Sequence, residues 1–222
     1  MKKKKIFLLI VLFFSLTTFV DINQTKKKSF FSIDSVELSG IKNANESKIK
    51  KKIELIKGKN LFFLRKNDIV SLLENNKFIK KIEIKKIYPN KLKISFQESL
   101  PIGILIQENK NFLLLQNGLV IKKFDKNKFN YLPLVSGIKA EKNYFKFYSE
   151  LKTINFNTDF VNKFYYYKVN RWDILLKDEK LIKLPSVNYI NSIERFIEIY
   201  QKEEFKKFKI FDFRIEKKLI LN

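Results

Sequence analysis

The stretch FIKKIEIKKIYPNKLKISFQ, residues 78–97, decides how the first half of the chain folds. Apolar residues alternate with polar ones on both sides of a short break, which is the period of a half-buried β-strand. They are Ile82 and Ile84 before the break, and Leu92, Ile94 and Phe96 after it. The break is Tyr88-Pro89-Asn90, in which proline fixes φ and asparagine tolerates a turn. The sequence therefore predicts a β-hairpin with one face in water.

Three further elements are expected before this hairpin. Apolar residues between 33 and 38 predict a short strand. A helix is expected after Asn45-Glu46, because asparagine caps helices well and an acid suits the first turn. A second helix is expected from about Lys66 to Asn76. Gly58-Lys59 lacks the glycine spacing and the Ser or Thr of a phosphate loop, so we interpret it as a turn between the helices. Residues 33–101 thus have the order β-α-α-β-β.

From Ile102 onward the pattern predicts hairpins and two helices. Two apolar runs flank Asn117-Gly118, a strong hairpin signal. Helical spacing begins at Tyr144, and strands are expected over about 164–169, 172–176 and 181–184. A second amphipathic helix is expected from about Val187 to Gln201. Its predicted apolar face is Ile190, Ile193, Ile197 and Tyr200, with Glu194 and Glu198 in water. The predicted fold class is therefore α+β, with a β-rich second domain over 102–222.

Composition excludes several classes of function. The chain has 222 residues, no cysteine and no histidine, which removes disulfides, thiolate nucleophiles, Cys/His metal clusters and imidazole bases. The net charge of +23 suggests binding to nucleic acid, because clustered basic residues neutralise phosphates. However, only four of the basic residues are arginines, and the lysines are spread along the chain without the Arg–aromatic interleaving that reads bases. We therefore expect no nucleic-acid partner.

The amino terminus carries an apolar run with two interpretations. Lys2 to Lys5 precede uncharged residues 6–20. The run resembles a signal peptide but lacks a small-x-small cleavage site, and it is short for a membrane-spanning helix, which usually has about 20 residues. If the run is counted to Ile22 and the lysines at both ends extend toward the membrane surface, its length comes near the lower limit of about 17 residues for a spanning helix. The leading lysines would keep the amino terminus in the cytoplasm, although Lys26 to Lys28 weaken that bias.

An ordered series of motifs resembles the FtsQ/DivIB family of bacterial cell division proteins. In the first half these are residues 36–43, 58–62, 78–84, 88–92 and 96–101, which resemble its POTRA module. In the second half, residues 132–137, 171–176, 195–200 and 211–214 resemble its β-rich domain. The resemblance implies a cytoplasmic tail at 1–5, a single transmembrane anchor at 6–22, a linker at 23–32, a POTRA domain at 33–101 and the β domain at 102–222. Lys218 stands about where many members have glycine.

Catalysis is not expected. The carboxylates show no pattern that predicts two convergent acids. Asp212 and Arg214 lie two apart on an expected strand and hence on one face, where we expect a surface pair worth under about 1 kcal/mol. No cofactor, metal or small-molecule substrate is therefore predicted.

The chain end offers a physical route to binding. A terminal strand from Ile215 to Leu221 at a sheet edge would present unpaired N–H and C=O groups to a partner's strand. Lys217 and Lys218 would deter self-pairing and favour an acidic partner. In the family this region docks a strand and helix of the small coiled-coil proteins FtsB and FtsL, or DivIC and FtsL, and Arg171 matches a basic position there. The candidate partner-binding residues are Arg171, Trp172, Arg214, Ile215, Lys217, Lys218, Leu219, Ile220 and Leu221.

The resemblance implies a non-enzymatic division scaffold. It would be a single-pass type II protein of the inner membrane at the division septum, linking early and late division proteins through its periplasmic domains. The alternative is a periplasmic POTRA-containing chaperone or export factor, released after signal cleavage. An outer-membrane translocator is not expected, because too few residues follow the POTRA segment for eight membrane strands.

Overall fold

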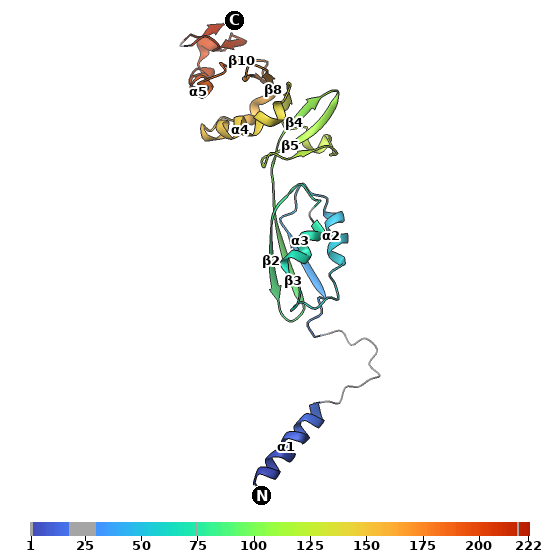
Figure 1. Ribbon diagram of the computed structural model, residues 1–222. Helices are drawn as coiled ribbons and strands as arrows, with labels where there is room; N and C mark the ends of the chain where they lie inside the picture. Colours follow the sequence, from blue (N-terminus) through green and yellow to red (C-terminus); the bar gives the residue numbers. More distant parts are fainter. Residues whose placement is uncertain (1, 18–29, 74, 217) are drawn as a thin grey trace.

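The computed structural model describes residues 2–17, 30–73, 75–216 and 218–222. Figure 1 shows one helix at the amino terminus and two domains that follow along the chain. Helix α1 spans Lys2–Thr17. Across the described ranges, no helix combines the length and apolarity needed to cross a bilayer. The expected anchor (6–22) and linker (23–32) both extend into residues 18–29, outside these ranges.

The first domain has the predicted order of elements. They are β1 (Ser35–Ser39), α2 (Glu46–Glu54), α3 (Lys66–Leu73), β2 (Ile79–Ile87) and β3 (Lys91–Glu98). The sheet order is β1-β3-β2, with β1 parallel and β2 antiparallel to β3. The hairpin is confirmed, with Ile84 opposite Ile94. Helix α3 ends at Leu73, before the expected Asn76.

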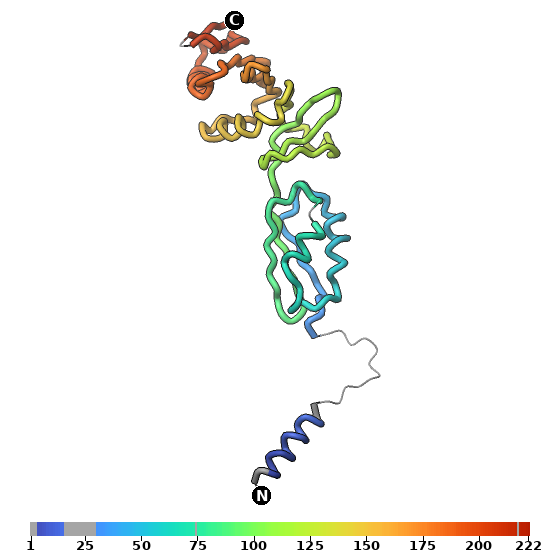
Figure 2. The backbone as a smooth tube through the Cα atoms, viewed as in Figure 1, coloured from blue at the N-terminus to red at the C-terminus, as the bar shows by residue number. Residues whose placement is uncertain are grey.

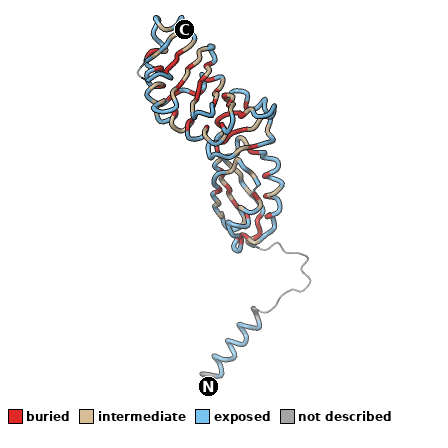
Figure 3. The backbone as a smooth tube through the Cα atoms, turned by 45° about the horizontal axis from the view of Figure 1, so that its top comes forward, coloured by how far each residue is buried: buried red, intermediate tan, exposed pale blue. Residues whose placement is uncertain are grey.

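Local chemistry explains where this domain's helices lie. The Asn45 side chain accepts a hydrogen bond from the Lys48 backbone N–H at 2.9 Å, so the predicted cap is confirmed. The turn at Gly58 is also confirmed, and Gly58 has a φ of +79°. Both helices cover one face of the sheet, where Ile53 and Ile69 join Ile94 in a buried cluster. Figure 3 shows such buried stretches inside each domain.

A single carboxylate ties the end of β3 to the loop that follows β1. Glu98 accepts the backbone N–H groups of Lys42, Asn43 and Ala44 at 3.1, 2.7 and 3.0 Å. Three donors on one carboxylate make a rigid end to the first domain. The next strand, β4, starts at Pro101, so the chain passes directly from one sheet into the other.

The second domain is one nine-stranded sheet with helices. Its strands are β4 (Pro101–Gln107), β5 (Lys110–Leu115), β6 (Val120–Ile121), β7 (Leu134–Ser136), β8 (Val161–Tyr167), β9 (Arg171–Leu176), β10 (Leu181–Lys183), β11 (Ile210–Asp212) and β12 (Ile220–Leu221). The helices are α4 (Ala140–Thr153) and α5 (Tyr189–Tyr200), with short 3₁₀ turns at Asn127–Phe129, Thr158–Phe160 and Glu203–Phe205. The strand order is β12-β11-β10-β9-β8-β7-β4-β5-β6. The predicted hairpin around Asn117-Gly118 joins β5 to β6.

Aromatic side chains fill the core between this sheet and its helices. Phe147 of α4 stacks on Trp172 of β9, with ring centroids 4.8 Å apart and planes within 9°. Phe164 of β8 meets both of these rings. The neighbouring row on the same sheet face, Ile174, Ile182 and Phe211, is fully buried. This large core holds the sheet rigid out to β11.

Two sequence expectations in this domain are wrong in detail. The buried face of α5 is Ile193, Phe196 and Ile199, whereas Ile197 is 42% exposed. The buried face therefore includes Phe196 in place of the predicted Ile197. Glu194 and Glu198 face solvent, as predicted. The terminal strand is also shorter than the expected 215–221, because β12 comprises only Ile220–Leu221.

Candidate partner-binding site at the carboxyl-terminal sheet edge

Strand β12 is the edge of the nine-stranded sheet. It pairs antiparallel with β11 alone, with Leu221 opposite Phe211 and Ile220 opposite Asp212. Figure 2 shows the carboxyl terminus at the end of the second domain that is remote from the first domain. Among the described residues, one border of this strand has no neighbour, and the sequence predicted this edge position.

The hydrogen-bond pattern identifies which backbone groups face that border. Asn222 N–H donates to the Ile210 carbonyl at 3.2 Å, and Ile210 N–H donates to the Asn222 carbonyl at 2.8 Å. In an antiparallel pair, residues that exchange such bonds alternate with residues whose N–H and C=O point outward. The next residue, Leu221, therefore turns both backbone groups away from β11. Its side chain packs against the core on the same face as Phe211.

A polar row crosses the opposite face of the sheet. Strand register aligns Asp173 of β9 with Lys183 of β10, Lys183 with Asp212 of β11, and Asp212 with Ile220 of β12. Both aspartates are buried, whereas Ile220 is 44% exposed. The row thus leads from two buried carboxylates to an exposed apolar side chain at the free edge.

Arg214 holds the carboxylate of Asp212. Its Nε lies 2.9 and 3.0 Å from the two carboxylate oxygens and its Nη2 lies 2.6 Å from Oδ2. The Arg214 backbone N–H also donates to Oδ1 at 3.0 Å. These bonds hold the pKa of Asp212 below its usual value. The predicted pair exists, but Asp212 is buried, so it is more than a surface contact.

This local bond also explains why the terminal strand is short. A carboxylate that accepts the backbone N–H two residues on forms a turn that competes with strand pairing. Strand β11 accordingly ends at Asp212, and the chain loops before it returns at Ile220. Of the predicted residues in this loop, Ile215 and Lys218 are exposed, and Lys217 lies outside the described residues.

Arg171 lies in a second charged group on the same sheet face. Its Nε is 3.4 Å from Oδ1 of Asp173, and its guanidinium carbon lies 4.3 Å from the ring centroid of Tyr167. Burial raises the pKa of Asp173, although Arg171 and the Tyr167 hydroxyl oppose that shift. Arg214 also acts electrostatically on Asp173, so the two arginines belong to one cluster. With Lys183, the cluster has three cations and two carboxylates.

Trp172, one of the predicted partner-binding residues, has a buried side chain in the free protein. It is only 4% exposed, and its ring packs against Phe147 and Tyr166 in the core. Alternation along β9 explains this, because the side chains of Arg171 and Trp172 point to opposite faces. Trp172 therefore supports the sheet, whereas Arg171 lies on the polar face.

A groove that the sequence did not predict lies beside the terminal loop. It has a volume of about 420 Å³ and is lined by the segment from Pro185 to Asn188, by residues of α5, and by residues 213–216 and Lys218 of the loop after β11. Arg195 and Arg214 both line it. No local sequence pattern identifies it, because its walls come from segments far apart in the chain.

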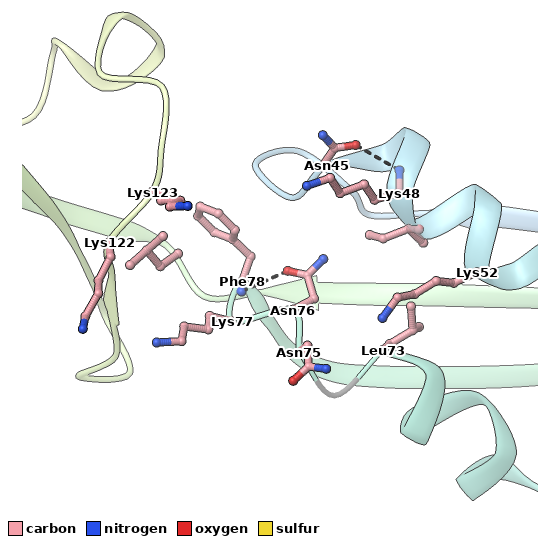
Figure 4. A pocket seen from close by; sticks show the side chains of 12 residues that line it. Asn45, Lys48, Lys52, Leu73, Asn75, Asn76, Lys77, Phe78, Lys122 and Lys123 are labelled. Atoms are coloured by element: carbon pink, nitrogen blue, oxygen red, sulfur yellow. Dashed lines mark hydrogen bonds between the residues drawn. The ribbon is translucent and has the colours of Figure 1, made fainter.

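A larger groove of about 550 Å³ lies between the two domains. Figure 4 shows its lysines, including Lys52, Lys77 and Lys122, extending in different directions. The Nζ atoms of Lys52 and Lys77 donate to the Leu72 and Val120 carbonyls at 2.6 and 3.1 Å. These side chains do not converge on one point, so they do not form a defined anion site. Among the described residues, no group of acidic side chains is arranged to hold a metal ion.

Two family models match the chain. The model described as "POTRA domain, FtsQ-type" matches residues 31–99, and "Cell division protein FtsQ/DivIB, C-terminal" matches residues 104–214. The second match alone covers half of the chain. Its range includes Arg171, Asp173, Asp212 and Arg214, the cluster beside β12.

Curated relatives agree with these matches. DivIB of Clostridium botulinum (strain Hall) is 30% identical over 122 residues, which are 55% of this chain and 47% of that protein. FtsQ of Rickettsia bellii is 29% identical over 174 residues, 78% of this chain and 65% of that protein. FtsQ of Rickettsia felis is 28% identical over 204 residues, which are 89% of this chain and 74% of that protein. The chain thus spans about half to three quarters of the length of these relatives.

Among solved structures, the major extracytoplasmic domain of DivIB from Geobacillus stearothermophilus has a TM-score of 0.38 and 16% identity. The matched region covers 46% of this chain and 92% of the DivIB chain. This likeness is too slight to carry an argument. Because family models match both domains and the named relatives agree with them, the chain belongs to the FtsQ/DivIB family of bacterial cell division proteins.

Proposed function

We propose that this protein is a non-enzymatic scaffold of the division machinery that captures a partner's β-strand along β12. One observation carries the proposal: Leu221 turns its N–H and C=O away from β11 at the open border of the sheet. A partner strand would satisfy these groups and extend the sheet. Because a large core holds the sheet out to β11, the edge is preorganised, which lowers the entropic cost of binding.

The charges beside this edge favour an acidic partner. Arg171 and Arg214 lie on the same sheet face as the exposed side chain of Ile220, and Lys218 is exposed in the loop before β12. A strand that carries an acid next to an apolar residue would complement this surface. The small coiled-coil division proteins of the FtsB and FtsL type are the partners that the family resemblance implies. Through them the scaffold would link early and late division components.

We further propose that the protein is anchored in the inner membrane with its amino terminus in the cytoplasm and its two domains in the periplasm, at the septum. The support is the sequence of the anchor, an apolar run behind four lysines. The competing candidate is an exported chaperone whose leader is removed. Amino-terminal sequencing of the mature protein separates the two: retention of Met1-Lys2 supports the anchor, and a start near Asp21 supports export. Depletion should give filaments with unseparated septa, and normal division after complete loss would contradict a division role.

The docking edge is tested by two substitutions at one position. Leu221→Pro removes the outward N–H donor, whereas Leu221→Ala removes a similar part of the side chain and keeps that donor. Binding of each variant to the candidate coiled-coil partner is measured by calorimetry on the full chain in detergent. We expect Leu221→Ala to bind within a few fold of wild type and Leu221→Pro to lose binding. Equal binding by both folded variants would refute strand capture.

A further inference from the structure

Five aromatic rings form a continuous chain of contacts at one end of the first domain. Ring centroids lie 5.2 Å apart for Phe30 and Phe31, 6.5 Å for Phe31 and Phe62, and 5.4 Å for Phe62 and Phe63. Tyr88 meets Phe31 at 6.0 Å. We name these five residues the aromatic pole. None of the rings belongs to the buried core cluster of this domain.

Three distant segments build the aromatic pole. Leu61 N–H donates to the Phe31 carbonyl at 2.7 Å, which fixes the loop after α2 against the entry to β1. Asp34 N–H donates to the Asn90 carbonyl at 2.9 Å, which fixes the hairpin turn there as well. Figures 1 and 2 show this end of the domain opposite the end that adjoins the second domain. The aromatic pole is therefore a built feature of the domain.

Four of the five aromatic residues are exposed to solvent, and Phe31 is half-buried. The exposed fractions are 76% for Phe30, 61% for Phe62, 74% for Phe63 and 52% for Tyr88. Soluble proteins rarely gather so many large apolar groups on one surface unless something covers them. The four exposed residues are not members of the buried core cluster of this domain, so packing in that core does not account for them.

Basic groups lie next to the rings. The Nζ of Lys86 donates to the Phe62 carbonyl at 3.0 Å. Ile33, three residues after Phe30, donates its backbone N–H to the Lys59 carbonyl at 3.0 Å. Lys59 is exposed. Lys91 follows the hairpin turn and is also exposed. Aromatic rings with neighbouring lysines match the chemistry of a bilayer interface with anionic lipid.

Chain length places the aromatic pole near the proposed anchor. Seven residues, 23–29, separate the apolar segment 6–22 from Phe30. Fully extended, they span at most about 25 Å. We propose that the aromatic pole docks on the outer surface of the inner membrane, with its rings at the headgroup level and its lysines on anionic lipid. This inference rests on the proposed membrane attachment and orients the first domain against the bilayer.

The test uses full-length protein in vesicles of phosphatidylethanolamine and phosphatidylglycerol that carry a nitroxide-labelled headgroup lipid. Because the chain has no cysteine, one environment-sensitive fluorophore can be placed at Lys91→Cys, which removes one of the three lysines but keeps Lys59, Lys86 and all five rings. Leu9→Cys reports insertion of the apolar segment, and Val187→Cys, on an exposed loop of the second domain, is the far control. We expect quenching and a blue-shifted emission at positions 9 and 91, but not at 187.

The outcomes separate this inference from the attachment on which it rests. An unquenched label at position 9 would show that attachment itself fails. Quenching at 9 without quenching at 91 would overturn membrane docking alone. Adding Phe62→Ser and Phe63→Ser to the Lys91→Cys protein should reduce quenching at 91 several-fold, with unchanged far-UV circular dichroism. If the label at 91 is shielded only after a division protein is added, the pole is a protein-binding surface and the proposal is wrong.

Discussion

Arg214→Gln and Asp212→Asn together test whether the ion pair behind β12 stabilises the sheet edge. Arg214 makes three side-chain contacts of 2.6–3.0 Å to a buried carboxylate. Hydrogen bonds to charged groups contribute about 1.5–3 kcal/mol in favourable sites. However, the Arg214 side chain is 44% exposed, so solvent screening reduces that value. Asp212 also retains one backbone donor after Arg214 is replaced. We therefore expect each single variant to lose about 1–2 kcal/mol of unfolding free energy.

The assay is urea unfolding followed by the fluorescence of the single tryptophan, Trp172, which lies in the same sheet. The double variant should lose about 1 kcal/mol less than the sum of the two single losses, because each single change already breaks the pair. The loss in Arg214→Gln should also depend on pH. The folded pKa of Asp212 is lowered from 3.8, so the stabilisation is present above pH 3.8 and is lost as pH falls through the folded pKa. Additive losses, or a loss independent of pH, would refute the reasoning.

The remaining predictions use the same unfolding assay. Asp173→Asn should equal or exceed wild-type stability at pH 7 and lose that advantage below pH 3.8, because burial raises the folded pKa above 3.8 and penalises the charged form. Gly137→Ala should cost well over about 2 kcal/mol, because its Cβ would lie 2.1 Å from a backbone carbonyl oxygen. Gly118→Ala should cost about 1 kcal/mol, because Gly118 also has a positive φ, +80°, but its Cβ would meet open space. Phe196→Ala should cost about 3–5 kcal/mol of unfolding free energy, because Phe196 is buried. Ile197→Ala should cost under about 1 kcal/mol, because Ile197 is exposed.

Local patterns predicted the first domain well because its signals are short-range. The alternation from Ile82 to Phe96 and the turn residues at 88–90 specify a hairpin without any distant contact. The cap at Asn45 is equally local. In contrast, α3 ends at Leu73, because an apolar spacing does not determine where a helix stops.

The second domain depends more on distant contacts. Helix α5 carries apolar residues around much of its surface, so spacing alone allowed Ile197 on the buried face, and only the position of the sheet selects Phe196 instead. Trp172 adjoins Arg171 in sequence but lies on the opposite face of β9. The length of β12 depends on the turn at Asp212, which a strand pattern does not reveal.

The most direct test of strand capture is hydrogen exchange at the amide of Leu221, measured by NMR with and without the coiled-coil partner. The free protein should exchange the Leu221 amide rapidly, because it points away from β11, and the Ile220 amide more slowly, because it faces β11. Binding should slow exchange at Leu221 strongly and at Ile220 only slightly. An amide of Leu221 that exchanges as rapidly in a saturated complex as in the free protein would contradict the account.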